Sequence, residues 1–183
     1  NLEDRIGGDS GLTEKGMKQA RALGLFFSRR KISYIFTSMK LRTRRTAEAI
    51  ADLQKNCRIV ALKEFDEINA GVCEGMTYAE IERQMPEIFR LREANKYDYA
   101  YPEGESYAKM RGRVEDGIKK SFFLNRSSDN ILIVGHQAVN RMILSHFLYR
   151  RKEDVPYIYV PQDRFYHIVS TQNKKVLELK RYD

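Results

Sequence analysis

The sequence has little cysteine and no long apolar run. Cys57 and Cys73 are the only cysteines among 183 residues. They form neither a C-x-x-C motif nor a Cys/His ligand spacing, which argues against a disulfide framework and against a zinc site. No apolar stretch is long enough to cross a bilayer, and acidic residues and glycines stand at the beginning, where a signal peptide would be apolar. These absences favour a soluble, cytoplasmic protein with no membrane partner, metal or cofactor.

The composition suits one globular domain over residues 1–183, because 42% of the residues are apolar and no repeat, low-complexity tract or linker divides the chain. The net charge of +8 would suit nucleic acid, an anionic membrane surface or a small polyanionic substrate. The basic runs 29–31 and 150–152 each follow a helix-like segment, where cations complement the helix dipole. The charge therefore permits an anionic ligand without choosing one.

Strands and helices alternate along the chain. We expect strands at 32–37, 58–62 and 131–134, a terminal hairpin of 165–170 and 175–180, and a loop at 64–75. We expect helices from an N-cap at Thr13 to about 28, at 43–53, after a capping box at Thr77, from Pro86, from Ser106 to about 122, and after His136. This order predicts an α/β fold, a three-layer sandwich in which helices cover both faces of a mostly parallel sheet.

His136 stands where a buried strand meets the start of a helix. In open α/β sheets ligands bind at the carboxyl ends of the strands, and a helix N-terminus offers unpaired N–H groups that suit phosphate. A packing role would not require histidine at this place, so we expect a functional one. His146, within a helix, and His167, in an alternating strand, are expected to be structural.

Arg42 repeats this arrangement, because Thr37 and Ser38 end a strand and the arginine follows at the next helix start. A guanidinium matches phosphate oxygens bidentately, although Thr-Ser is also ordinary N-cap chemistry. Glu67 lies in a loop rich in acids and glycines. A partly desolvated carboxyl near phosphate would have a raised pKa and could protonate a leaving oxygen, although a solvated acidic loop explains the same pattern.

Together these segments resemble the histidine phosphatase superfamily. The resemblance rests on Thr37-Ser38-x-x-x-Arg42, Glu67-x-x-x-Gly71-x-x-Glu74 and Gly135-His136, which occur in the family's order, and on Leu12-Thr13-x-x-Gly16. It implies a phosphoglycerate mutase-like fold. Further residues are similar to the fructose-2,6-bisphosphatase domains of the bifunctional kinase/phosphatase family: Asn69–Glu74, Tyr99-x-Tyr101-Pro102-x-Gly104-Glu105-Ser106-Tyr107 and His136-Gln137-Ala138-Val139-x-Arg141.

That resemblance implies hydrolysis of fructose 2,6-bisphosphate to fructose 6-phosphate and phosphate through a phosphohistidine. By matching positions, the implied catalytic residues are Glu67 as proton donor, His136, Arg42 and Asn1. The implied substrate-binding residues are Asn1, Gly7, Arg42 and Gln137 for the 2-phosphoryl group, and Tyr78, Arg92, Lys96, Tyr107 and Arg141 for the fructose 6-phosphate part. Two arginines and a lysine would neutralise the second phosphate, and tyrosine hydroxyls would fix its oxygens without adding charge.

The family's nucleophile is another histidine, in an Arg-His-Gly run on the first strand. We expect that strand to lie before residue 1, so that the domain is N-terminally incomplete here, and we assign its role to none of the three histidines present. The partner is expected to be a sugar bisphosphate rather than nucleic acid, and both a homodimer and fusion to a kinase domain stay open. The alternatives are a phosphoglycerate mutase, a broad-specificity phosphatase, or a non-catalytic sugar-phosphate binder.

Overall fold

Three parallel strands form the central sheet of the computed structural model, which describes residues 5–125, 130–148, 150–170 and 175–182. Strand β1 (Ile32–Thr37) lies between β2 (Arg58–Ala61) and β3 (Asn130–Val134) and is parallel to both. Strands β4 (Arg164–Ser170) and β5 (Lys175–Arg181) form a separate antiparallel pair. The predicted hairpin strands are confirmed, and the predicted turn at 172–173 lies outside the described residues.

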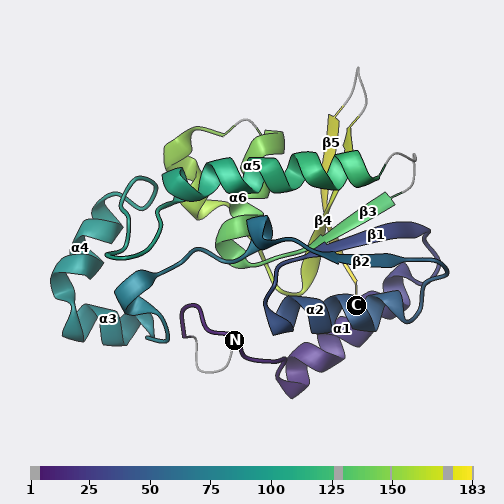
Figure 1. The fold of residues 1–183 in the computed structure, drawn as a ribbon, viewed down its shortest axis with the longest axis horizontal. Coiled ribbons are helices and arrows are strands. Elements are labelled where there is room, and N and C mark those ends of the chain that lie inside the picture. Colours follow the sequence, from purple (N-terminus) through teal and green to yellow (C-terminus); the bar gives the residue numbers. More distant parts are fainter. Residues whose placement is uncertain (1–4, 126–129, 149, 171–174, 183) are drawn as a thin grey trace.

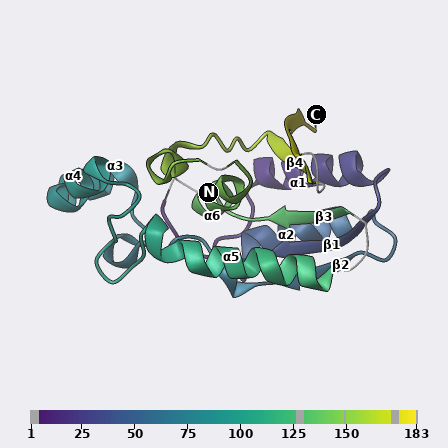
Figure 2. The ribbon, with the colours of Figure 1, turned by 90° about the horizontal axis from the view of Figure 1, so that it is seen from above.

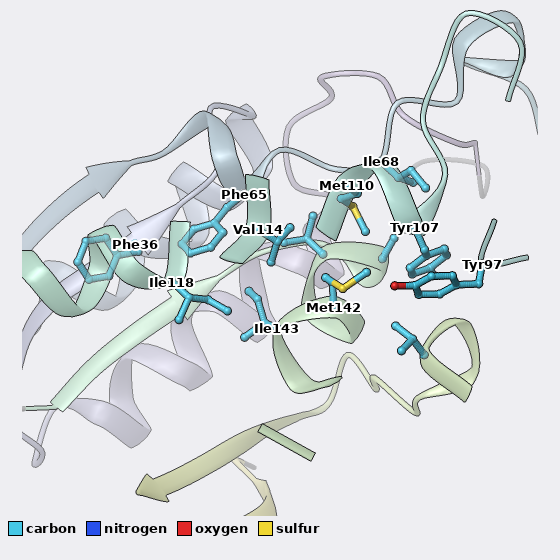
Figure 3. Close-up of a cluster of buried hydrophobic side chains, with 13 residues drawn as sticks. Phe36, Phe65, Ile68, Tyr97, Tyr107, Met110, Val114, Ile118, Met142 and Ile143 are labelled. Carbon is cyan, nitrogen blue, oxygen red and sulfur yellow. The ribbon is translucent and has the colours of Figure 1, made fainter. Parts of the chain in front are cut away.

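Helices cover both faces of the sheet (Figure 1). Helices α1 (Glu14–Phe27) and α2 (Leu41–Ala51) lie on one side, and α5 (Tyr107–Leu124) and α6 (Gln137–Leu148) lie on the other. The alternation of β1 explains this layering, because Ile35 packs with Ala47 and Ile50 of α2 while its neighbour Phe36 packs toward α5 and α6. Figure 3 shows this second core. The predicted three-layer α/β sandwich is confirmed.

Helices α3 (Tyr78–Gln84) and α4 (Pro86–Ala94) stand to one side of the sandwich (Figure 2). Both predicted bonds of the capping box are present, since Thr77 accepts from the Glu80 N–H and the Glu80 carboxylate accepts from the Thr77 N–H. Pro86 begins α4 as predicted. A small third core of Ala70, Cys73, Ile81 and Tyr101 fixes this lobe to the rest.

The helix boundaries differ slightly from the prediction. Helix α2 begins at Leu41, two residues earlier than expected, because the N-terminal residues of this helix carry no side-chain cap that the sequence could reveal. The predicted loop 64–75 contains the short 3₁₀ helices η2 (Lys63–Phe65) and η3 (Gly71–Cys73), and a third, η4 (Lys152–Tyr157), follows α6. Such short turns leave little periodicity in a sequence.

Strand β3 differs from β1 in its burial. Ile35 and Phe36 of β1 are fully buried, but the apolar side chains of β3 from Ile131 to Val134 are each only partly buried. Within the described residues β3 pairs with β1 alone. In the described part of the chain the other edge of β3 has no strand paired with it, and the side chains of β3 from Ile131 to Val134 are apolar on both faces of the sheet.

Candidate active site

The carboxyl ends of β1 and β3 meet because the two strands are in parallel register, with Thr37 opposite Val134. Ser38 follows β1, and Gly135 and His136 follow β3 directly before α6. This is the edge at which open α/β sheets bind ligands. His136 and Arg42, which follow two different strands in the sequence, therefore lie together at one edge of the sheet.

His136 is 6% exposed and is held at both ring nitrogens. Arg42 Nε donates to Nδ1 over 3.2 Å, and Nε2 lies 2.8 Å from Ser38 Oγ. A guanidinium can only donate, so Nδ1 accepts and the neutral ring donates its Nε2 proton to Ser38. Ser38 in turn lies 2.8 Å from Thr43 Oγ1, which donates to the Lys40 carbonyl. The imidazole is thereby fixed in one tautomer and one orientation.

The environment of His136 opposes its protonation. Burial, followed by the positive charges of Arg42 and Lys40, lowers the pKa of His136 from 6.5 to about 3. Arg42 also donates from Nη1 to the Gly8 carbonyl over 2.8 Å, which brings the loop at residues 5–9 against the start of α2. The pocket thus joins a neutral imidazole to a guanidinium, a pair that can hold an anionic phosphoryl group.

Glu67 lies at the N-terminus of α6, beside His136. Its carboxylate accepts from the N–H groups of Ile68 at 3.0 Å and of Ala138 and Val139 at 3.3 Å each. Burial raises the pKa of Glu67, and these N–H groups and the charge of Arg42 offset only part of that effect. A carboxyl with a raised pKa, close to a phosphate-binding pair, is suited to donate a proton to a leaving oxygen.

Glu74 connects the loop of residues 5–9, which contains Gly7 and Gly8, to the Glu67 loop. The Glu74 carboxylate accepts from the Gly8 N–H at 3.1 Å and from the Ala70 N–H at 2.9 Å, so it ties the loop of residues 5–9 to the Glu67 loop. Gly7 has a φ of +72°, and a Cβ there would collide with the Glu74 carboxylate. Asn1, the other residue expected to bind the phosphoryl group, lies outside the described residues.

A second cationic group is built on α3 and α4. The Arg92 guanidinium lies over the rings of Tyr78 at 5.5 Å and Tyr101 at 5.4 Å, and its side chain is 14% exposed. Lys96 forms an ion pair with Glu93 at 2.9 Å and lies 5.1 Å from the centre of the Tyr157 ring. Tyr78, Arg92 and Tyr101 therefore lie together, and Lys96 is linked to Arg92 through Glu93, which Arg92 also contacts at 3.3 Å.

Tyr107 and Arg141 connect this group to Glu67. Arg141 donates to the Tyr107 hydroxyl at 3.4 Å and to the Ile158 carbonyl at 3.0 Å. Tyr107 is buried against Tyr97 (Figure 3), and burial raises its pKa, with the charge of Glu67 acting in the same direction and that of Arg92 opposing it. Gln137 is exposed at the first position of α6, next to His136. Glu67 therefore lies within electrostatic reach of Arg42 and of Tyr107, and Tyr107 in turn interacts with Arg141 and Arg92.

Sequence reasoning did not single out several residues that shape the site. Asp66 accepts from the Met39 N–H at 2.7 Å, and Asp9 accepts from the Leu41 N–H at 2.6 Å, so two carboxylates fix the turn that leads into α2. Tyr101 was visible only as part of a motif, and Arg113 gave no local signal. The other two histidines lie elsewhere, His146 against Phe147 near the end of α6 and His167 beside Glu178 in the hairpin.

Two further properties bear on what the site can do. Among the described residues, no three His, Cys, Asp or Glu side chains gather closely enough to hold a metal ion. No helix in the described part of the chain is both long and apolar enough to cross a membrane. What the site does gather is cations, tyrosine hydroxyls and one carboxyl of raised pKa, a set suited to binding and protonating a phosphate ester.

Comparison with known proteins gives a consistent result. The family model for the histidine phosphatase superfamily (branch 1) matches residues 1–182. Mouse (Mus musculus) 6-phosphofructo-2-kinase/fructose-2,6-bisphosphatase 1 is 43% identical over 163 residues, which is 88% of this chain and 33% of that protein. Human (Homo sapiens) 6-phosphofructo-2-kinase/fructose-2,6-bisphosphatase 4 is 41% identical with the same coverage. The chain spans about a third of the length of the curated relatives it matches.

Solved structures share the fold. The alpha-ribazole phosphatase from Shigella flexneri has a TM-score of 0.85 at 22% identity, covering 99% of this chain and 90% of that one. YhfR of Bacillus stearothermophilus has a TM-score of 0.83 at 24% identity, covering 98% and 90%. At these identities the likeness concerns the arrangement of helices and strands. It agrees with the layered α/β sheet.

Proposed function

Because this chain belongs to the histidine phosphatase superfamily, we propose that its site hydrolyses fructose 2,6-bisphosphate to fructose 6-phosphate and phosphate. The observation that carries the proposal is that Glu67 interacts with Arg42 and also with Tyr107, which links it to a second cationic group. The first group is the Arg42–His136 pair and the second is Arg92 with its tyrosines. A substrate with two phosphates and a sugar between them would engage both groups at once.

The 2-phosphoryl group is assigned to the pair of Arg42 and His136. Arg42 supplies charge and paired donors, and the neutral imidazole, oriented by Ser38, contacts the phosphoryl oxygens without adding a charge. The N-terminus of α6 adds N–H groups and positive potential at the same place. Gln137, Gly7 and Asn1 complete this half of the site in the proposal.

The 6-phosphate and the sugar are assigned to the other group. Arg92, Lys96 and Arg141 would neutralise the phosphate, while Tyr78 and Tyr107 would hold its oxygens and the sugar hydroxyls. Burying a phosphate without such partners would be strongly unfavourable. Binding of the remote phosphate would thus align the bond at C2 with Glu67.

In the proposed reaction a histidine nitrogen attacks phosphorus while the bond from phosphorus to the fructose O2 breaks. Glu67 gives its proton to that oxygen and becomes a carboxylate, which then takes a proton from the water that hydrolyses the phosphohistidine. We assign the nucleophile to the Arg-His-Gly histidine expected ahead of Asn1, since both nitrogens of His136 are engaged by Arg42 and Ser38. The open, partly buried edge of β3 suits one more parallel strand carrying it.

A substrate panel tests the proposal. Initial rates of the full-length protein are measured with fructose 2,6-bisphosphate, 3-phosphoglycerate and p-nitrophenyl phosphate at matched concentrations. The sugar bisphosphate should be preferred in kcat/KM by at least about 100-fold, since only it fills both groups. Equal activity on all three substrates would contradict the assignment and favour a broad phosphatase. An acid-labile, alkali-stable phosphoryl label on the quenched protein would support the phosphohistidine.

A further inference from the structure

We infer that Arg113, paired with Glu105, is the positioning residue that aims Glu67 at the reacting oxygen. Arg113 lies on α5, and its partners in the Glu67 loop are 46 to 49 residues away in the chain. Within the described part of the chain its hydrogen-bond partners are Glu64, Asp66, Glu67 and Glu105, none of which is assigned to bind substrate. The inference rests on the proposed function, because it assigns a task to a residue that acts through the proton donor.

The guanidinium of Arg113 uses all five of its N–H donors. Nη1 donates to the carbonyls of Glu64 at 2.9 Å and Asp66 at 2.7 Å, and Nη2 donates to the carbonyl of Glu67 at 3.4 Å. The remaining donors form a bidentate pair with Glu105, from Nε at 2.9 Å and from Nη2 at 2.7 Å. A planar fork with fixed donor directions can satisfy this set, and a lysine cannot.

Glu105 holds the same loop at Asn69, on the other side of Glu67. Besides Arg113, its carboxylate accepts from the Asn69 N–H at 3.1 Å, and its own backbone N–H donates to the Asn69 carbonyl at 2.8 Å. Although burial favours its neutral form, the hydrogen bonds from Arg113 and Asn69 hold the pKa of Glu105 below its ordinary range. The Arg113–Glu105 pair thus forms hydrogen bonds to the loop both before and after Glu67.

The hydrogen bonds from Arg113 and Glu105 orient the carboxylates of the loop. The carbonyls of Glu64, Asp66 and Glu67 point toward Arg113. The carboxylates of Asp66 and Glu67 reach the Met39 N–H and the start of α6. A proton donor must lie within hydrogen-bond reach of the leaving oxygen, and a displacement of about 1 Å can lower a rate about 100-fold. Loosening the loop should therefore weaken proton donation before it weakens binding.

The test compares leaving groups in the full-length protein. Arg113→Lys should lower kcat for fructose 2,6-bisphosphate by at least about tenfold with little change in KM. Its rate on p-nitrophenyl phosphate should stay within about twofold of wild type, because a nitrophenolate departs without a proton. In a Glu67→Gln background the same substitution should cause no further loss on the sugar substrate.

Arg111→Lys is the matched control, since Arg111 lies on the same helix, is largely exposed and interacts with Glu115 and Tyr97. It should leave both rates unchanged. Glu105→Gln provides a second variant, with a smaller loss and the same selectivity, in case Arg113→Lys unfolds in a thermal melt. An equal loss on both substrates, or losses that multiply in the double variant, would overturn the inference.

Failure of the proposed function would look different. A wild-type protein that hydrolyses p-nitrophenyl phosphate but not fructose 2,6-bisphosphate would remove the substrate assignment alone. The leaving-group comparison would then be made with the fastest alkyl phosphate in place of the sugar, and it would still decide whether Arg113 acts through Glu67.

Discussion

Arg42 Nε donates a hydrogen bond to His136 Nδ1 over 3.2 Å, which joins the start of α2 to the start of α6. The bond requires an unprotonated Nδ1, and burial together with the charge of Arg42 lowers the pKa of His136 to about 3. The imidazole of the folded protein therefore stays neutral well below its ordinary pKa of 6.5. The same relationship couples the phosphate pocket to the pH dependence of stability.

His136 should make the fold acid-sensitive. Its pKa is 6.5 in the unfolded chain and about 3 in the folded one, so below pH 6.5 the unfolded state binds more protons. Its contribution is complete above pH 6.5 and is lost as the pH falls toward 3, by about 1 kcal/mol per pH unit. Urea unfolding across this window should show a shallower slope in His136→Gln. Identical slopes would contradict the buried, neutral assignment.

Glu67 should be needed chiefly for poor leaving groups. Glu67→Gln keeps an acceptor at the start of α6 but removes the proton, so kcat for fructose 2,6-bisphosphate should fall by about 100-fold or more. Because the pKa of Glu67 is raised, wild-type kcat/KM should decline as the pH rises through that pKa, and the variant should lack this decline. An undiminished rate in the variant would exclude Glu67 as the acid.

Arg92 should govern binding rather than chemistry. Replacing its guanidinium in Arg92→Met leaves the second phosphate without its cation between Tyr78 and Tyr101, so KM should rise roughly 10- to 100-fold with kcat changed much less. Arg90→Met is the control, because Arg90 is exposed on the same helix and pairs with Glu87. A fall in kcat at unchanged KM would argue that Arg92 serves the reacting group instead.

Two glycines of α5 should respond to alanine in opposite directions. A Cβ at Gly117 would stand 2.6 Å from Phe65 Cε1 and 2.9 Å from Glu64 Cβ, so Gly117→Ala should destabilise the fold by about 1–3 kcal/mol. At Gly112 nothing lies within 4 Å of the added atom, and Gly112→Ala should stabilise the helix by up to about 1 kcal/mol. Thermal melts of both variants check the sign, and a stabilised Gly117→Ala would contradict the close approach of α5 to η2.

The layered fold could be predicted because its signals are local. Thr77 and Ser106 mark helix starts through their side-chain caps, and the burial of Ile35–Thr37 in β1 follows from the apolar run that the sequence shows there. His136 could be found for the same reason, since a strand end and a helix start are adjacent in the sequence. The hairpin strands were recognised from their period of two.

The long-range contacts that hold the site residues in place could not be predicted from local patterns in the sequence. Arg113 meets the Glu67 loop across 46 to 49 residues, and neither partner carries a pattern that refers to the other. Tyr101 reaches Arg92 only because the segment after α4 folds back on it. The roles expected of Tyr78, Lys96 and Arg141 come from family resemblance. The structure adds that Tyr78 lies against Arg92, Lys96 beside Tyr157 and Arg141 on the Tyr107 hydroxyl.

We propose that the pocket of Arg42, His136 and Glu67 cleaves the phosphate at C2 while the cluster around Arg92 retains the other. Phosphorus-31 NMR of fructose 2,6-bisphosphate during turnover by the full-length protein tests this most directly. We predict that the 2-phosphate signal is converted to inorganic phosphate while the 6-phosphate signal remains as fructose 6-phosphate. Loss of the 6-phosphate, or of both phosphates at equal rates, would contradict the orientation of substrate across Glu67.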